Sequence, residues 1–313
     1  MYSIEVNNLT KKFGDFTAVN NISFKVKAGE IFGFLGANGA GKTTAIKMMC
    51  GILEPTSGDA IVGGYSIAKD PNSVKMNIGY MSQRFSLYND LAVGENIDFF
   101  GGVYGLEGKE FKERKKWVLE IANLQDRENV LTGSLPGGIK QRLALGTAVI
   151  HKPSIVFLDE PTSGVDPISR RRFWDLINDL SDQGVTVFVT THYLEEAEYC
   201  NNIILIDSGE LIAEGSSKEL KSKYLEHKII EIECSNVIAA LDILDKETFV
   251  INSSIFGNTI HVSVAENEDY KTQIKRALEN KKDISIKRMN EITPTLEDVF
   301  IHLLEKRKNA VSN

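Results

Sequence analysis

A glycine-rich loop ending in Lys42 and Thr43 is the segment of this sequence that most directly predicts chemistry. It spans residues 36–44 (GANGAGKTT) and follows an apolar run at residues 31–35. Glycines let successive backbone N–H groups point inward at a polyphosphate, and a helix that begins near Lys42 adds the positive end of its dipole. The spacing therefore predicts a strand, a phosphate-binding loop and a helix that together bind a nucleoside triphosphate.

The side chains at the end of this loop have separate expected tasks. Lys42 would reach the β- and γ-phosphates, the hydroxyl of Thr43 would bind Mg²⁺, and Thr44 could hydrogen-bond a phosphate oxygen. The rest of the predicted nucleotide-binding loop consists of Gly36, Asn38, Gly39, Ala40 and Gly41.

Two neighbouring carboxylates, Asp159 and Glu160, follow the apolar run at residues 155–158. A parallel sheet delivers residues at the carboxyl ends of its strands to a ligand crevice. Asp159 is expected to hold Mg²⁺, usually through water, and Glu160 to act as general base on the water that attacks the γ-phosphate. A solvated strand end with two acids is the plainer interpretation, and the upstream loop favours the catalytic one.

Length and composition predict a large core and two domains. The chain has 313 residues, 42% of them hydrophobic, and a net charge of −7, which disfavours nucleic acid as the main partner. No apolar run approaches the roughly 20 residues that span a bilayer, and the first residues lack a signal-peptide pattern, so we expect a cytoplasmic chain. The three cysteines are widely spaced, which indicates neither a disulfide framework nor a zinc site.

The order of predicted elements positions the loop and the acids in an α/β fold. Alternating segments open the chain and predict an antiparallel β subdomain, and helical patterns between about residues 84 and 135 predict a helical insertion. Buried strands are expected in the core at 31–35, 78–81, 155–158, 185–189 and 203–206. Strands and helices that alternate in this way indicate a parallel core sheet.

After Tyr224 the pattern changes to strand, helix, strand, strand, helix, strand. This βαββαβ order predicts a small α+β, ferredoxin-like C-terminal module, so we expect domains at residues 1–224 and 225–313. Thr295 and Asp298 form a capping-box pattern that predicts a last helix with an apolar stripe. The module could serve in dimerisation or regulation, and its residues indicate no ligand.

Several motifs in this order resemble those of the ATP-binding subunit of an ABC transporter, over about residues 2–224. They are the loop at 36–44, Gln83, LPGGIKQR at 135–142, LDEPTSGVDP at 158–167 and TTH at 190–192. The tail, with PTLEDVF at 294–300, resembles the C-terminal extension of bacterial ABC exporters whose permeases are of the type-2 class. The resemblance implies a P-loop NTPase core of the ABC ATPase type.

The resemblance also implies roles for residues outside the loop. Phe13 would stack on the adenine of ATP and Val19 would pack beside it, although a lone aromatic is often plain core. Gln83 would contact Mg²⁺ or the attacking water, and His192 would hydrogen-bond the γ-phosphate and steady Glu160. The implied catalytic set is Glu160, His192, Gln83 and Lys42, and the implied Mg²⁺ ligands are Thr43, Gln83 and Asp159.

The family signature would bind the γ-phosphate held by a second copy, so ATP would join two copies head to tail. Its residues here are Leu135, Pro136, Gly137, Gly138 and Gln141, and Asp166 would lie in the loop that crosses to the second copy. The family usually has Ser where this chain has Pro136, which removes a hydroxyl donor and a backbone N–H. We expect a weakened but working site, with a helix that starts at Ile139.

The family's partner is an integral membrane permease, expected to bind the Gln83 loop and the helical insertion from the inner face of the cell membrane. Phe85, Leu87 and Tyr88 could line that groove or simply pack locally. The resulting prediction is an ATP-hydrolysing subunit that powers export. Two alternatives stay open: a soluble ABC ATPase that acts on ribosomes or DNA, and a weakly hydrolysing regulatory subunit. The transported substrate is undetermined.

Overall fold

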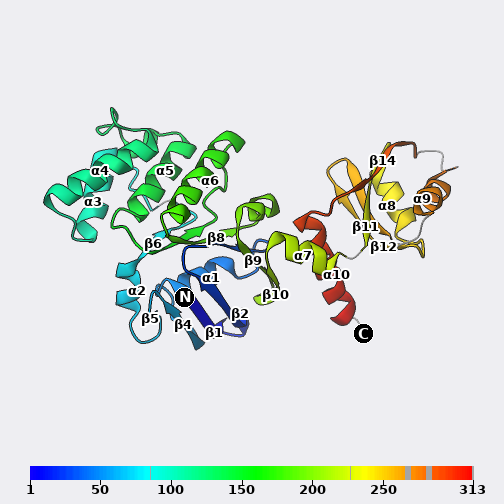
Figure 1. Ribbon diagram of the computed structural model, residues 1–313, viewed down its shortest axis with the longest axis horizontal. Coiled ribbons are helices and arrows are strands. Elements are labelled where there is room, and N and C mark those ends of the chain that lie inside the picture. The colour runs from blue at the N-terminus through cyan, green and yellow to red at the C-terminus, as the bar shows by residue number, and fades with distance from the viewer. Residues whose placement is uncertain (85, 226, 265–268, 280–283, 312–313) are drawn as a thin grey trace. The chain divides into compact units, whose positions relative to one another are not determined.

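The computed structural model describes residues 1–84, 86–225, 227–264, 269–279 and 284–311 (Figure 1). The chain divides into two compact units, Met1–Ser216 and Ser217–Asn313. The sequence had suggested a division after Tyr224. Helix α7 (Ser217–Tyr224) instead groups with the second unit, because it packs against the last helix, α10 (Leu296–Val311).

A six-stranded sheet in the order β10-β9-β3-β8-β7-β6 forms the centre of the first unit. All neighbours are parallel except β10, which runs antiparallel to β9 and was not predicted. Strands β3, β7 and β8 are buried along their whole lengths, as their continuous apolar runs predict. The strand bounds are β3 (Ile31–Leu35), β6 (Ile78–Met81), β7 (Ile155–Asp159), β8 (Thr186–Thr191), β9 (Asn202–Asp207) and β10 (Glu210–Gly215).

The predicted antiparallel subdomain is a second sheet in the order β2-β1-β4-β5. Its strands are β1 (Tyr2–Phe13), β2 (Phe16–Lys27), β4 (Ser57–Val62) and β5 (Tyr65–Ser66). The core that these strands share with helix α1 (Lys42–Met49) and the central sheet holds a group of aromatic rings whose centroids lie 5.4–6.1 Å apart. The rings belong to Phe24, Phe32, Phe34, Phe157 and Phe188.

The helical insertion contains α3 (Val93–Val103) and α4 (Gly108–Ala122), which pack against α5 (Gly137–Ala148). Helix α6 (Pro167–Asp182) packs on β8 and β3. The remaining short helices of this unit are α2 (Pro71–Asn77), η1 (Thr132–Ser134) and η2 (Leu194–Tyr199).

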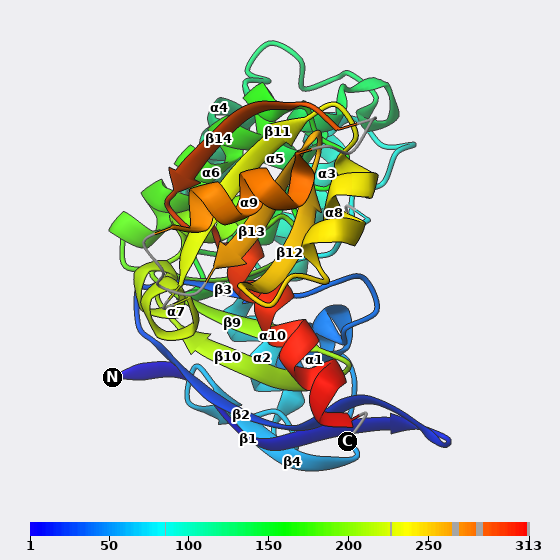
Figure 2. The same cartoon turned by 90° about the vertical axis from the view of Figure 1, so that its right-hand side faces the viewer.

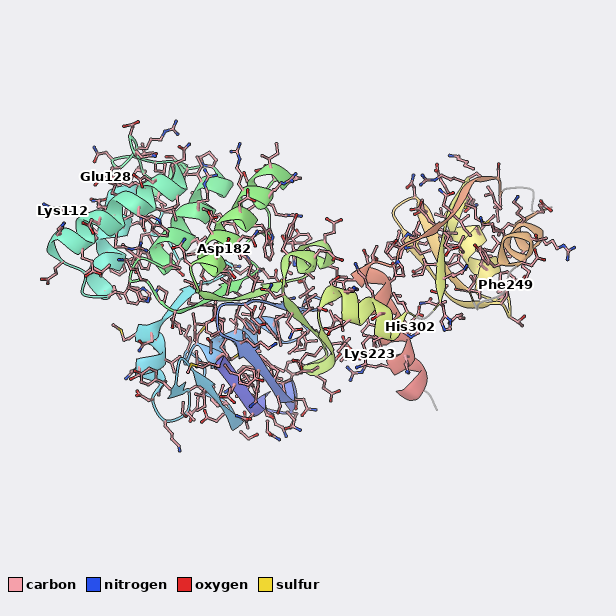
Figure 3. All side chains as sticks on the ribbon, in the orientation of Figure 1. Lys112, Glu128, Asp182, Lys223, Phe249 and His302 are labelled. Atoms are coloured by element: carbon pink, nitrogen blue, oxygen red, sulfur yellow. The ribbon has the colours of Figure 1, made fainter. Side chains whose placement is uncertain are left out.

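The charged face of α4 is largely solvated. Lys112 lies on the outer side of the insertion (Figure 3), and Lys109 pairs with Glu113 at 3.8 Å. Arg114 and Lys115 are less exposed. Arg114 is half-buried and donates to the carbonyls of Val149 and Ile150, which connects the insertion to the segment after α5. Lys115 is 19% exposed and pairs with Asp98 and Glu128.

The second unit has the predicted βαββαβ order in a ferredoxin-like arrangement. Its antiparallel sheet is ordered β12-β13-β11-β14, and α8 and α9 cover one face (Figure 2). An apolar cluster lies between these helices and the sheet. The element bounds are β11 (Lys228–Cys234), α8 (Val237–Leu244), β12 (Val250–Phe256), β13 (Thr259–Val264), α9 (Tyr270–Leu278) and β14 (Ile286–Ile292).

A buried hydrogen-bond network holds the start of α10 against this sheet. The Asp298 carboxylate accepts from the Thr295 backbone N–H and hydroxyl at 2.7 and 2.6 Å, as the capping-box pattern predicts, and lies 2.8 Å from Nδ1 of His261. Burial alone would raise the pKa of Asp298, but these hydrogen bonds outweigh it and hold the pKa below its usual value. His261 thus has a structural role in this network. Within the described residues, no helix combines the length and apolar character needed to cross a bilayer.

Candidate functional site

The glycine loop connects β3 to α1, as predicted, and two of its glycines have no room for a side chain. A Cβ on Gly36 would lie 2.2 Å from the Ile206 carbonyl oxygen, and one on Gly41 would lie 2.4 Å from that of Ala18. Gly39 and Gly41 also have positive φ angles of 85° and 103°. The loop therefore holds its curved shape because other backbone segments press directly against it.

Lys42, the first residue of α1, turns back into the loop. Its side chain is 3% exposed, and Nζ donates to the carbonyls of Gly36 and Ala37 at 2.8 and 3.2 Å. The same ammonium lies 3.1 Å from Oε1 of Glu160. A buried ammonium that donates to protein oxygens is suited to donate to phosphate oxygens instead when a nucleotide binds.

Asp159 connects the ends of three segments. Its Oδ1 accepts hydrogen bonds from the hydroxyls of Thr43 at 3.1 Å and Thr190 at 2.8 Å. Burial raises the pKa of this carboxyl, and the hydrogen bonds from the two hydroxyls lower that pKa only in part, so it stays above its usual value. The carboxylate is thus fixed between α1, β7 and β8.

Glu160 is the point at which the predicted catalytic side chains meet. Its Oε2 accepts from Nε2 of Gln83 at 3.1 Å and lies 3.1 Å from Nδ1 of His192, while Lys42 holds the other oxygen. Glu160 is 7% exposed and has a φ of 46°, a left-handed conformation that is strained for a residue with a side chain. Its backbone N–H donates to the carbonyl and hydroxyl of Thr190, which holds that conformation.

The donors at this site fit Mg²⁺ bound together with a triphosphate. Mg²⁺ typically takes one or two carboxylates and completes its octahedron with water and phosphate oxygens. Thr43 and Asp159 already share a hydrogen bond, so their oxygens converge on one place. Across the described parts of the chain, no cluster of three or more His, Cys, Asp or Glu residues could hold a metal by itself. Gln83 contacts Glu160 rather than this pair.

The two residues predicted near adenine have different environments. Phe13 ends β1 and is 50% exposed, so its ring is open to a ligand, and Nζ of Lys11 lies 5.2 Å from the ring centroid. Val19 is fully buried beneath Gly41, which argues against direct contact with a base. In the loop, Asn38 is exposed, Thr44 is half-buried, and the Ala40 carbonyl accepts from Gly209.

The signature segment forms the start of α5, two residues earlier than expected. Pro136 is the exposed N-cap residue, and its carbonyl accepts from the N–H groups of Ile139 and Lys140. The side chain of Leu135 is buried, Gly137 is exposed, and a Cβ on Gly138 would lie 2.5 Å from Oγ of Ser169. Of the first turn of this helix, the N–H groups of Gly137 and Gly138 precede the first intrahelical hydrogen bonds, so they are the donors that this surface offers to an anion.

Gln141 and Asp166 have roles within the chain that the sequence did not indicate. Gln141 is fully buried, and its amide donates to the carbonyl of Pro161. The exposed Asp166 caps α6 by accepting from Ser169 and Ile168 at 3.0 and 3.1 Å, and these hydrogen bonds lower its pKa.

Sequence reasoning missed Thr190 and the buried carboxylate of Glu196. Thr190 precedes His192 by two residues at the end of β8, so its place in the TTH motif was the available signal. Glu196 is 2% exposed, accepts from the hydroxyl of Thr162 and lies 3.5 Å from Nε of Arg170. It connects the loop after Glu160 to the segment after His192, and nothing in its sequence position indicates this contact.

Comparisons with known proteins assign both units. Residues 19–163 match the family model described as ABC transporter, and residues 215–304 match the model for the C-terminal domain of DrrA1-3-like ATP-binding proteins. The chain is 36% identical over 304 residues to the linearmycin resistance ATP-binding protein LnrL of Bacillus subtilis, covering 96% of this chain and 97% of that protein. It is 35% identical over 273 residues to the Nod factor export ATP-binding protein I of Burkholderia lata, covering 87% of this chain and 89% of that protein.

A more similar relative is much longer than this chain. The probable multidrug ABC transporter ATP-binding protein YbhF of Escherichia coli is 52% identical over 220 residues, which are 70% of this chain but only 38% of that protein. Among solved structures, the ATP-binding subunit of an ABC transporter superposes with a TM-score of 0.65 at 27% identity, covering 71% of this chain and 92% of the other. The dimeric post-hydrolysis ATP-binding cassette MJ0796, bound to ADP and Pi, superposes with a TM-score of 0.63 at 26% identity. The match covers 68% of this chain and 98% of the other.

The close approach at Gly36 generates a prediction about nucleotide binding. Gly36→Ala places a methyl group against the Ile206 carbonyl, so the loop must shift, and we expect nucleotide affinity to fall by at least about tenfold, near 1.4 kcal/mol. Titration with a fluorescent ADP analogue measures this. Gly102→Ala, where a Cβ meets nothing within 4 Å, is the control and should bind normally. Unchanged affinity in Gly36→Ala would contradict the tight packing.

Proposed function

This chain belongs to the ABC transporter family of ATP-binding subunits, and from that premise we propose that it hydrolyses ATP to drive export through a separate membrane permease. The observation that carries the proposal is the convergence of Lys42, Gln83 and His192 on the carboxylate of Glu160. Beside it, Thr43 and Asp159 form a pair suited to Mg²⁺. A site that only bound nucleotide would not need a carboxylate held in this way.

The residues of the site have distinct tasks in the proposed reaction. Glu160 takes a proton from a water whose oxygen attacks the γ-phosphorus, and the bond from that phosphorus to the bridging oxygen of ADP breaks. Gln83 and His192 hold Glu160 in place, and Lys42 exchanges its carbonyl partners for phosphate oxygens. Thr43 and Asp159 would hold Mg²⁺, which would neutralise negative charge on the phosphates. Gln83, which the sequence also predicted as a ligand of the ion, is hydrogen-bonded to Glu160 instead.

Glu160→Gln tests this assignment. The amide cannot take the proton, so we expect hydrolysis to fall at least about 100-fold while ATP still binds. Phosphate release measures turnover, and equilibrium titration measures binding. Glu113→Gln, at an exposed carboxylate on α4, is the matched control and should keep full activity. Wild-type turnover in Glu160→Gln would refute Glu160 as the base.

We further propose that two copies join head to tail around two ATP molecules. The exposed start of α5 at Pro136 and Gly137 supports this, because its free N–H groups can meet a phosphate presented by another copy. The regulatory alternative finds no support in a site that keeps Gln83, Glu160 and His192 together.

Pro136→Ser tests the signature surface. The added hydroxyl can donate to a phosphate oxygen, and such a hydrogen bond to a charged group contributes about 1.5–3 kcal/mol. We therefore expect ATPase activity to rise several-fold, measured as phosphate release at saturating ATP. Pro136→Ala restores the backbone N–H without the hydroxyl, so it should stay near wild type if the hydroxyl is responsible. Unchanged or lower activity in Pro136→Ser would contradict the proposal.

An exposed aromatic group beside the Gln83 loop supports docking of an apolar permease helix. Tyr88 and Phe99 are 49% and 43% exposed, their ring centroids lie 4.9 Å apart, and Phe100 lies 5.3 Å from Phe99. Leu87 is buried, and Phe85 lies outside the described residues. Such a contact would place the chain at the cytoplasmic face of the cell membrane, with substrate choice made by the permease.

Tag-based capture from gently solubilised membranes tests this partner. We expect a stoichiometric polytopic membrane protein to co-purify, and Phe99→Asp to reduce its recovery at least about fivefold by burying a charge in the contact. Met76→Asp, at another exposed apolar side chain, should leave recovery unchanged. Capture of ribosomal or DNA-bound proteins without a permease would favour the soluble alternative.

A further inference from the structure

The outer edge of strand β12 (Val250–Phe256) lacks the features that keep soluble proteins from pairing through their sheets. β12 ends the sheet order of the second unit, and within the described residues its only strand partner is β13. Its sequence, VINSSIF, contains no charged residue, no proline and no glycine. Edge strands are usually protected by such residues, because an open row of N–H and C=O groups can pair with another strand.

The opposite edge of the same sheet is protected in the usual way. Strand β14 carries Lys287, Arg288 and Glu291, and its register against β11 is irregular next to Lys287. Arg288 pairs with Glu231 at 2.7 Å and Lys287 with Glu233 at 3.8 Å. The absence of charge on β12 is therefore specific to one edge.

Exposed isoleucines accompany the unprotected edge. Helix α8 packs against β12 (Figure 2). Ile251 and Ile255 of β12 are 43% and 41% exposed, and Ile238 of α8 is 65% exposed. Removing such apolar side chains from water stabilises an association. The edge thus offers backbone hydrogen bonds and apolar area together.

The sequence of β12 is self-complementary when two copies run antiparallel. Pairing centred on Ser253 sets Ile251 opposite the partner's Ile255 and Asn252 opposite the partner's Ser254. At the ends, Val250 meets the partner's Phe256. Apolar residues face apolar ones and polar residues face polar ones, as a two-fold isologous contact requires. The register irregularity against β13 lies at the Val250–Asn252 end, so the centre of this pairing uses the regular part of the strand.

We propose that two copies of this chain associate through their β12 edges, joining their C-terminal sheets into one continuous sheet. This contact uses no residue of the nucleotide site and needs no ATP. It therefore differs from the head-to-tail arrangement proposed above, which depends on nucleotide, and each can fail without the other. The C-terminal unit would keep two copies together between rounds of hydrolysis.

Sedimentation velocity on the full chain, with EDTA and without nucleotide, tests the association. We expect a concentration-dependent dimer at micromolar concentrations. Ile255→Lys sets a charge in the contact and should raise the dissociation constant at least about tenfold. Because Ile255 is partly exposed in the single chain, the variant should fold, which circular dichroism checks. Met76→Lys, an exposed position in the first unit, is the control and should not change the dimer.

Disulfide trapping gives a second readout that does not rely on a destabilising change. Facing residues of an antiparallel pair lie about 4.5–5.5 Å apart at Cα, which a disulfide can bridge. The double variant Asn252→Cys with Ser254→Cys should form a covalent dimer on mild oxidation. The matched pair Lys287→Cys with Glu291→Cys, on the protected edge, should not.

Three results would overturn the proposal: a wild-type chain that stays monomeric without nucleotide, a dimer that Ile255→Lys leaves intact, or equal trapping at both edges. A dimer that forms only with ATP would also overturn it and would leave the proposed ATPase function standing. Conversely, loss of hydrolysis in every site variant would not affect the β12 contact.

Discussion

The buried carboxylate of Asp159 is the interaction on which the arrangement of the nucleotide site depends. One of its oxygens accepts from Thr43 at the start of α1 and from Thr190 at the end of β8. An unpartnered carboxylate is costly to bury, so these two donors keep β7, β8 and the phosphate loop in register. Thr190 then receives the N–H of Glu160 and fixes the left-handed turn that aims the Glu160 side chain.

Buried polar contacts also stabilise the loop that follows Glu160. Gln141 of α5 donates to the carbonyl of Pro161, and the hydroxyl of Thr162 donates to Glu196 in the segment after His192. The start of α5, which we propose to meet ATP on a second copy, is therefore connected through α5 to the loop that follows Glu160 in its own chain.

Much of the fold could be predicted because it depends on patterns local in sequence. The glycine loop, the acids after a buried strand and the βαββαβ order each follow from neighbouring residues, and the structure has all three. Strand β10 and helix α7 were not predicted, because their short, partly exposed segments lack a clear period. The burial of Gln141 against the Pro161 carbonyl was not predicted either, because the burial of a side chain depends on segments distant in sequence that pack above it.

The sequence by itself determined which chemical groups exist and which strand, loop or helix carries each one, since φ/ψ preferences and hydrophobic period act over a few residues. Only the tertiary structure decided that Gln83, Lys42 and His192 converge on Glu160, because these residues lie far apart in the chain and meet only where parallel strands end at one edge. It also decided that β12 lies at an open edge, since strand order in a sheet is set by the packing of the whole unit.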